Sequence, residues 1–263
     1  MTQNLKQFFP VILTLLIFIL AQGLSTVLVF ILGTEATTVS LVLMVSDILA
    51  VLCCYCFLHN IHFVTFDDFF SISWWPGLLA VAGGLLGAMS ISILNENVEL
   101  PEAMLQMYLG MSQNLLGLLT LVIVGPIAEE LIFREAIEGE MLRQGVNPWL
   151  AILVSALAFS AIHINLAQVL YALPLGIIFG IIYYKTGNII LTSILHILNN
   201  GLVVTQIHAF GEDFADISYA EWFGSTSKAY AFMVLFAALC LGLMMVFWKH
   251  YRPREETIKS NTT

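Results

Sequence analysis

The sequence is poor in charged side chains, which make up 10% of its 263 residues, whereas soluble domains carry about 25%. Hydrophobic residues make up 59% of the chain. The polar side chains are therefore too few to cover a water-soluble globule. This shortage excludes an ordinary soluble domain and predicts an integral membrane protein.

Positive charge is especially scarce. The chain has 9 Lys and Arg against 18 Asp and Glu, and its formal net charge is -9. Nucleic-acid binding depends on Lys and Arg that neutralise phosphates, and the only basic cluster is C-terminal, at Lys249, Arg252, Arg254 and Lys259. We interpret this cluster as a cytoplasmic anchor for anionic headgroups, and we expect no nucleic-acid partner.

Metal-binding motifs are missing as well. Cys53, Cys54, Cys56 and Cys240 lie in apolar segments, without the second cysteine pair of a typical structural zinc site. The His-Glu-x-x-His pattern of hydrolytic zinc sites is also absent. We therefore expect the cysteines to be small packing residues, and we expect no cofactor.

Long apolar runs are what the chain does have. A transmembrane helix needs about 20 apolar residues, and turn or polar residues divide the chain into eight candidate spans. The candidates are residues 8–32, 39–58, 75–94, 113–137, 148–164, 168–184, 188–206 and 229–248. The predicted fold class is all-α, a polytopic membrane protein that forms a single domain over 1–263.

The distribution of positive charge predicts the orientation. Lys6 precedes the first span, Arg143 and Lys185 follow the fourth and sixth spans, and the basic tail follows the last. The connections on the other side are acidic or uncharged, apart from Lys228 at the edge of the last span. By the positive-inside rule, we expect a multi-pass protein of the bacterial inner membrane with both termini in the cytoplasm.

Polar side chains at membrane depth gather in the second half of the chain. Glu129 and Glu130 are neighbours in the fourth span, where a charge costs roughly 3 kcal/mol or more. His163 lies in the fifth span, and His196 is in the seventh. Asp47, a lone acid in the second span, is expected to make a structural hydrogen bond.

Helical spacing sorts these groups. Glu130 and Arg134 are four residues apart with the acid first, so they share a face and are expected to pair. Glu129 is rotated by about 100° from Glu130, which leaves it free to face another partner. Phe159 precedes His163 by four residues, so its ring can pack beside the imidazole and restrict its rotamer.

Distance from a turn relates Glu129 to His163. Each is 17 residues from Val146, at the centre of the turn between the fourth and fifth spans. In an antiparallel pair they would lie at the same height, roughly 20–25 Å from the turn at 1.5 Å per residue. The amphipathic stretch 134–143 is expected to extend the fourth span into the cytosol, with a water-filled cavity opening there.

This combination of side chains predicts hydrolytic chemistry. Glu and His can act on a water as general base, and a second His with Asn can donate hydrogen bonds to a developing oxyanion. Together they suit amide hydrolysis without a Ser or Cys nucleophile. Two alternatives remain open, a zinc site formed by Glu129, His163 and His196, and the proton relay of a transporter.

Three ordered motifs resemble those of the CAAX-protease and bacteriocin-processing (CPBP, Abi) family of intramembrane endopeptidases, which includes the type II CAAX prenyl endopeptidases. The motifs are Glu129-Glu130-x-x-x-Arg134, Phe159-x-x-x-His163 and His196-x-x-x-Asn200, each on a separate span. The resemblance covers about 115–205, which would be the catalytic core in spans four to seven.

The resemblance implies a role for each motif residue. Glu129 and His163 would activate the water, and His196 and Asn200 would form the oxyanion site. The supporting residues would be Glu130, Arg134 and Phe159. Although the family has been called a metalloprotease family, its resemblance implies a glutamate-dependent enzyme without zinc.

The leading hypothesis is therefore an intramembrane protease that cleaves a membrane-associated protein or peptide within the bilayer. The main alternative is a non-enzymatic scaffold or bacteriocin-immunity protein with the same fold, which has no physical need for an unpaired acid such as Glu129. A proton-coupled transporter is disfavoured, since inverted repeats with broken helices are not evident in the sequence.

Overall fold

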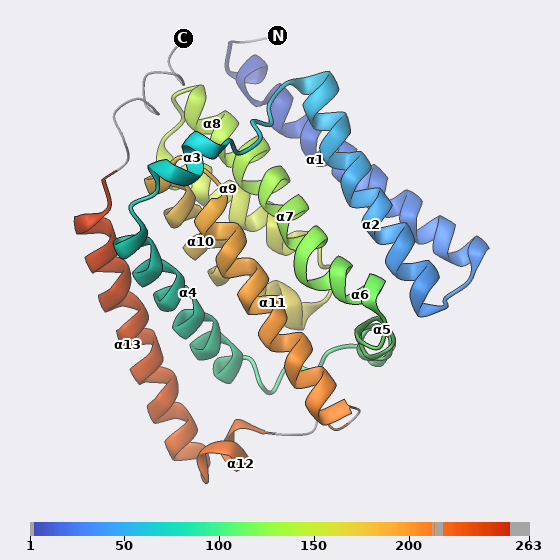
Figure 1. The fold of residues 1–263 in the computed structure, drawn as a ribbon, viewed down its shortest axis with the longest axis vertical. Coiled ribbons are helices and arrows are strands. Elements are labelled where there is room, and N and C mark those ends of the chain that lie inside the picture. Colours follow the sequence, from blue (N-terminus) through green and yellow to red (C-terminus); the bar gives the residue numbers. More distant parts are fainter. Residues whose placement is uncertain (1–2, 212, 214–217, 253–263) are drawn as a thin grey trace.

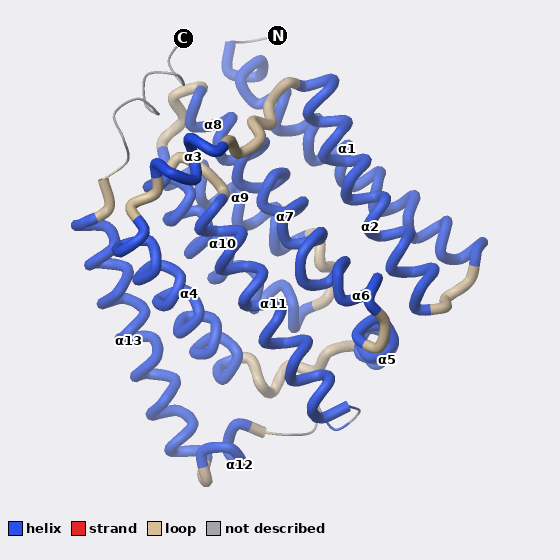
Figure 2. Tube along the Cα trace, viewed as in Figure 1, coloured by secondary structure: helices blue, strands red, loops and turns tan. Residues whose placement is uncertain are grey.

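A computed structural model describes residues 3–211, 213 and 218–252 of the chain. Every regular element in these ranges is a helix, as Figure 2 shows. The predicted all-α class is therefore confirmed. In chain order the elements are α1 (Gln3–Leu32), α2 (Ala36–Cys53), η1 (Cys54–Leu58), α3 (Phe66–Ser71), α4 (Trp74–Leu94), α5 (Glu102–Ser112), α6 (Leu115–Leu119), η2 (Thr120–Val124), α7 (Gly125–Glu129), η3 (Glu130–Gly139), α8 (Glu140–Arg143), α9 (Pro148–Ala161), α10 (Leu166–Thr186), α11 (Ile190–Phe210), α12 (Tyr219–Phe223) and α13 (Thr226–His250).

Seven helical segments of the described chain are long and apolar enough to cross a membrane. They are Phe8–Leu32, Ala36–Leu58, Trp74–Leu94, Leu115–Arg143, Leu166–Thr186, Ile190–Phe210 and Thr226–His250. The fifth predicted span, 148–164, is the shorter helix α9, which ends at Ala161. These helices confirm a polytopic membrane protein with about eight helices, and they explain why so many large apolar side chains are exposed.

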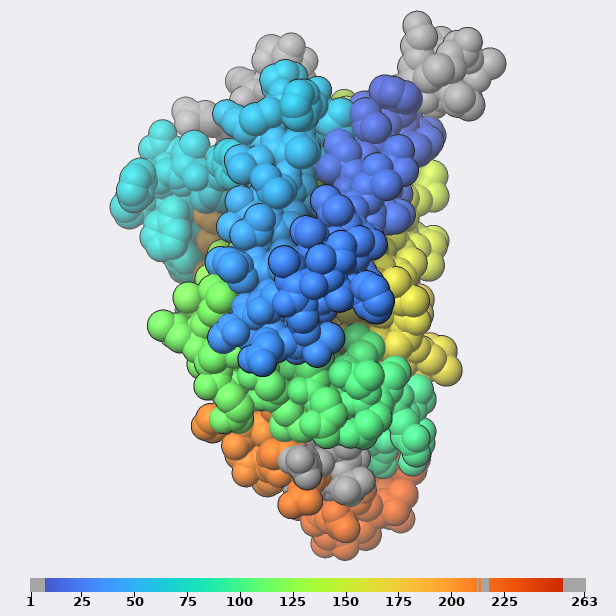
Figure 3. Space-filling model, turned by 90° about the vertical axis from the view of Figure 1, so that its right-hand side faces the viewer, coloured from blue at the N-terminus to red at the C-terminus, as the bar shows by residue number. Residues whose placement is uncertain are grey.

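The helices are arranged so that the start of α1 and the end of α13 lie at the same end of the bundle (Figure 1). This placement agrees with the even number of crossings that the charge pattern predicts. Figure 3 shows α1 and α2 side by side on one face, above the green segment that includes α5. The helices at the centre of the bundle carry the motif residues.

The fourth span, Leu115–Arg143, is unusual because it alternates between α-helical and π-helical turns. A π turn widens the helix and commonly marks a functional site. Both glutamates of the first motif lie where α7 passes into η3. Glu129 is 14 residues from each end of this span, so the span holds the motif at its middle.

The stretch 134–143, which is expected to extend the fourth span into the cytosol, is mostly buried within the helix bundle. All ten residues of η3, Glu130–Gly139, are buried, and they pack against α1, α9 and α10. The amphipathic pattern of this segment therefore reflects polar groups inside the helix bundle, of which Glu130, Arg134 and Glu135 have side-chain partners. Only the short helix α8 after Gly139 is partly exposed, at three of its four residues.

Small residues such as Gly87 and Gly176 allow the central helices to approach closely. A Cβ atom added to Gly87 would lie 2.9 Å from Cys240 Sγ, and one added to Gly176 would lie 3.1 Å from Phe159 Cδ1. All four cysteines are free thiols. Cys240 is thus a small side chain packed against a glycine, as predicted.

Gly176→Leu should lower the free energy of unfolding by about 1–3 kcal/mol, because the added side chain overpacks a tight contact. At this position the Cα of Ala156 would be 3.2 Å from the new Cβ, so backbone has to move. Thermal unfolding in detergent measures the effect. Gly242→Leu is the matched control, since nothing lies within 4 Å of its added Cβ, and equal melting temperatures for the two variants would contradict the prediction.

Candidate active site

The predicted ion pair of the first motif is present and completely buried. Arg134 Nε lies 3.4 Å from Glu130 Oε2, and both side chains are 0% exposed. Removing one partner of such a pair leaves an uncompensated charge in the interior, which costs about 3–5 kcal/mol. The pair is therefore a fixed element on which neighbouring groups can be ordered.

The guanidinium of Arg134 is held by three further groups. Its Nη1 donates a hydrogen bond to Ser155 Oγ over 3.0 Å. Its central carbon lies 4.9 Å from the ring centroid of Phe159 and 5.3 Å from that of Phe179, distances that permit cation–π attraction. Phe159 therefore supports the first motif as well as its own.

His196 lies between the two glutamates of the first motif. Its Nδ1 is 3.0 Å from Glu130 Oε1, and its Nε2 is 3.6 Å from Glu129 Oε2. A carboxylate accepts hydrogen bonds, so Nδ1 carries the proton toward Glu130 and fixes the tautomer of the ring. Attraction across the second contact then requires a proton on either Glu129 or His196 Nε2.

His163 is fixed by its own motif partner. Its Nδ1 donates to the backbone carbonyl of Phe159 over 2.9 Å, and the two rings meet edge to face at 5.3 Å. The predicted packing of these two rings is confirmed. The same Phe159 ring also lies 5.7 Å from the His196 ring, centroid to centroid, so it contacts both imidazoles. Because Nδ1 of His163 carries the proton, its Nε2 is available as an acceptor.

The turn that carries His163 is strained. The next residue, Ile164, has φ 59°, a left-handed conformation that is unfavourable for a β-branched side chain. Asn165 stabilises the turn, since its Nδ2 donates to the His163 carbonyl and its Oδ1 accepts from Gln168 N to cap α10. This turn explains why α9 ends three residues before the predicted limit of the fifth span.

Asn200 connects the third motif to the fourth span. Its Nδ2 donates to the carbonyl of Leu121 in η2 over 3.0 Å, and its Oδ1 accepts from Asn199 Nδ2. Tyr171 in turn donates its hydroxyl to Asn199 Oδ1. One amide hydrogen of Asn200 remains for another acceptor, and this chain of contacts fixes the rotation of α11.

Asp47 makes a hydrogen bond between helices, as expected. It is buried, and Gln22 Nε2 of α1 donates to its Oδ1 over 2.8 Å. The pair joins α1 to α2 and gives this lone acid a structural partner.

No group of three or more His, Cys, Asp or Glu side chains in the described part of the chain is arranged to hold a metal ion. The zinc alternative with Glu129, His163 and His196 therefore lacks a converging ligand set in this arrangement. Glu129 has His196 as its ion-pair partner rather than His163.

An apolar groove lies between α2 and the fourth span. Its volume is about 280 Å³. The lining is entirely apolar and consists of Ile48, Val51, Leu52, Phe63, Ile123, Val124, Ile127, Ala128 and Leu131. This groove suits apolar side chains.

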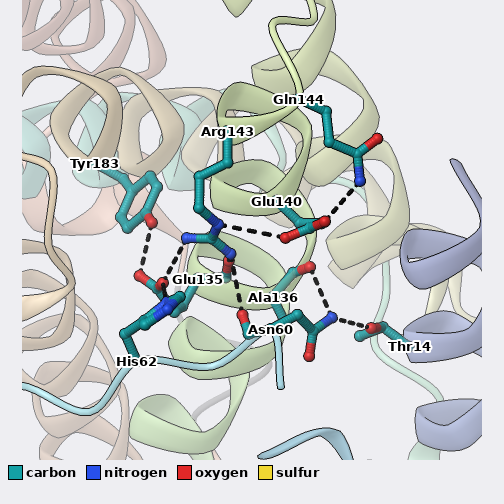
Figure 4. Close-up of polar contacts among 9 residues, drawn as sticks. All are labelled: Thr14, Asn60, His62, Glu135, Ala136, Glu140, Arg143, Gln144 and Tyr183. Atoms are coloured by element: carbon teal, nitrogen blue, oxygen red, sulfur yellow. Dashed lines mark hydrogen bonds and ion pairs between the residues drawn. The ribbon is translucent and has the colours of Figure 1, made fainter. Parts of the chain in front are cut away.

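A second polar cluster, which sequence reasoning missed, lies farther along the fourth span (Figure 4). Glu135 accepts hydrogen bonds from Arg143 Nη1 at 2.8 Å, from His62 Nδ1 at 2.9 Å and from the Tyr183 hydroxyl at 2.6 Å. His62 and Tyr183 come from other parts of the chain. The eight-residue spacing of Glu135 and Arg143, about two helical turns, was the only sequence signal.

The same cluster holds the segment after η1 in place. Arg143 Nη2 donates to the Asn60 carbonyl, and the Asn60 side chain donates to Thr14 Oγ1 and to the Ala136 carbonyl. It therefore joins α1, the 59–65 loop and the fourth span, as Figure 4 shows.

Ile164→Gly should preserve or raise the melting temperature, because glycine removes a backbone cost of roughly 1–2 kcal/mol in the left-handed region. The Ile164 side chain is 91% exposed, so little burial is lost. Leu170→Gly is the control in regular helix, where glycine costs about 1 kcal/mol. A larger destabilisation at Ile164 than at Leu170 would show that the turn is not strained.

Glu135→Ala should lower stability by about 3 kcal/mol or more, because it leaves Arg143 without its main buried partner. Glu140→Ala is the matched control, since Glu140 binds the same arginine but is 18% exposed, and such pairs contribute about 1 kcal/mol or less. Thermal unfolding compares the two. Equal losses would mean that the buried position of Glu135 has no special effect.

The comparisons with known proteins bear on this site. Residues 111–202 match the family model described as Type II CAAX prenyl endopeptidase Rce1-like. This range contains all three motifs, and the resemblance that the motifs carry is confirmed. No solved structure matches the chain.

Two bacterial proteins are similar to the chain over this region. YdiL of Bacillus subtilis (strain 168), named provisionally as a membrane peptidase, is 35% identical over 82 residues, which are 31% of this chain and 33% of YdiL. The membrane-embedded CAAX protease MroQ of Staphylococcus aureus (strain USA300) is 33% identical over 87 residues, 31% of this chain and 35% of MroQ. The chain thus aligns with about a third of each relative's length.

Proposed function

Because residues 111–202 match the Rce1-like type II CAAX prenyl endopeptidase model and contain all three motifs, we propose that the chain is an intramembrane endopeptidase. It hydrolyses a peptide bond in a membrane-associated protein or peptide. The observation that carries the proposal is the difference between the adjacent glutamates. The Glu130 side chain is 0% exposed and ion-paired with Arg134, whereas the Glu129 side chain is 22% exposed.

Glu129 acts as the general base. One of its carboxylate oxygens takes a proton from the attacking water as the water oxygen bonds to the carbonyl carbon of the substrate. The π electron pair of the carbonyl moves onto its oxygen. His163 orients the water through Nε2, because its Nδ1 is committed to the Phe159 carbonyl.

The intermediate collapses when its C–N bond breaks. The amide nitrogen receives the proton that Glu129 took from the water, and the products are a carboxylic acid, which ionises, and an amine. His196, in the imidazolium form that carries a proton on Nε2 as well as on Nδ1, and Asn200 donate hydrogen bonds to the oxyanion. Asn200 uses the amide hydrogen that Leu121 does not engage.

The buried pair supports this chemistry through His196. Glu130 accepts the Nδ1 hydrogen of His196, so a positive charge that develops on the imidazole is balanced next to it. Arg134 compensates the charge of Glu130 when His196 is neutral. The reaction as proposed requires no metal ion.

The apolar groove between α2 and the fourth span suits apolar side chains of a substrate that approaches within the bilayer. Its wall includes Val124 and Ala128 of the span that carries Glu129. Membrane-associated proteins and peptides therefore form the expected substrate class.

Glu129→Gln and His163→Ala should each lower the rate of substrate cleavage at least 10²-fold, the usual contribution of general acid–base groups. Glu140→Gln, an acid-to-amide change in the same span, is the matched control and should leave the rate unchanged. Comparison of membrane proteomes from wild type and Glu129→Gln cells identifies the substrate as the protein that remains uncleaved. Full activity of both site variants, in protein that extracts normally in detergent, would refute the proposal.

Metal dependence is tested on the purified protein. Cleavage is expected to continue in EDTA. Loss of cleavage in chelator and its recovery with added zinc would favour the alternative in which Glu129, His163 and His196 rearrange to bind the metal.

A further inference from the structure

Tyr108 lies outside the segment that the family model matches, yet the structure connects it to the site. It is carried by α5, which packs against α2, α6 and α11 and is seen nearly end-on beside α6 in Figure 1. The α2 and α11 helices carry Asp47 and His196. The position of α5 therefore brings its side chains to the same part of the bundle as the motifs.

A chain of hydrogen bonds leads from Tyr108 to His163. Gln168 Nε2 donates to the Tyr108 hydroxyl over 2.8 Å, and Gln168 Oε1 accepts from Asn165 Nδ2. Asn165 Nδ2 also donates to the His163 carbonyl over 2.9 Å. The phenol is thus fixed relative to the strained turn that carries His163.

The hydroxyl of Tyr108 has a hydrogen to donate. Its oxygen accepts from the Gln168 amide, which cannot accept in return, and its own hydrogen bonds to no protein group in the described ranges. Burial raises the pKa of Tyr108, and the negative charge of Glu129 raises it further. The phenol therefore stays protonated at neutral pH and lies within the electrostatic reach of Glu129.

Each of the other donors near the glutamates already makes at least one contact within the protein. His196 faces Glu130 with Nδ1 and Glu129 with Nε2. Asn200 uses one amide hydrogen on the Leu121 carbonyl. An oxyanion that forms near Glu129 needs preorganised donors, and Tyr108 offers one that is fixed in place and uncommitted.

We propose that Tyr108 is a further catalytic residue, whose hydroxyl donates a hydrogen bond to the carbonyl oxygen of the scissile peptide bond. As the water oxygen bonds to the carbonyl carbon, the π electron pair moves onto that oxygen, and the phenol hydrogen bond strengthens. The proton stays on Tyr108, and the water's proton goes to Glu129. This inference rests on the proposed peptidase function.

Tyr108→Phe tests the inference, because it removes the hydroxyl and keeps the ring. We expect kcat to fall about 10²-fold, as on loss of one oxyanion donor, with KM and the melting temperature little changed. Tyr230→Phe on α13 is the matched control and should behave as wild type. Unchanged kcat in Tyr108→Phe would overturn the inference.

Gln168→Leu separates donation from packing. It removes the hydrogen bond to the phenol but leaves the hydroxyl in place, so its kcat should fall less than that of Tyr108→Phe. Equal losses of kcat and melting temperature in both variants would make Tyr108 a structural residue and overturn the inference. As a second probe, 3-fluorotyrosine at position 108 should shift the alkaline limb of the kcat profile to lower pH, and a structural hydroxyl would leave the profile unmoved.

Glu129→Gln in the same assay distinguishes failure of the proposed peptidase function from failure of the role of Tyr108. An active Glu129→Gln protein would remove the proposed function itself. An inactive Glu129→Gln protein together with a fully active Tyr108→Phe protein would remove only the role of Tyr108.

Discussion

The buried charge of Arg134 is the constraint around which the site is organised. The guanidinium is 0% exposed, with Glu130 as its ion-pair partner and two aromatic rings beside it. Since an isolated charge in this environment is unfavourable by several kcal/mol, Glu130 cannot move away without loss of stability. The fixed Glu130 carboxylate then orients His196, and His196 in turn faces Glu129.

The aromatic ring of Phe159 extends this order to His163. One ring contacts Arg134, His163 and His196, so the second motif cannot be repacked without disturbing the other two. Close approach of α10 to α9 at Gly176 holds the ring in position. Packing and electrostatics therefore act on the same few side chains, which explains how a site with three partly exposed members, Glu129, His163 and Asn200, remains ordered within an apolar helix bundle.

The sequence was most informative where the relevant interactions are local. Apolar runs predict the spans, and four-residue spacings predict the contacts Glu130–Arg134 and Phe159–His163, both of which are present. Contacts between helices were harder to predict. Equal distance from the turn at Val146 relates Glu129 to His163 in height, but it does not indicate the contact of Glu129 with His196 on α11 or the cluster around Glu135.

The sequence by itself determined the membrane class, the helical segments and the three motifs, because these follow from composition and from a helical period that repeats every few residues. Only the tertiary structure decided which side chains meet between helices. That choice depends on the rotation and tilt of each helix, which π turns in the fourth span and the left-handed residue at Ile164 alter locally. It likewise brought Tyr108 from α5 into hydrogen-bonded connection with His163.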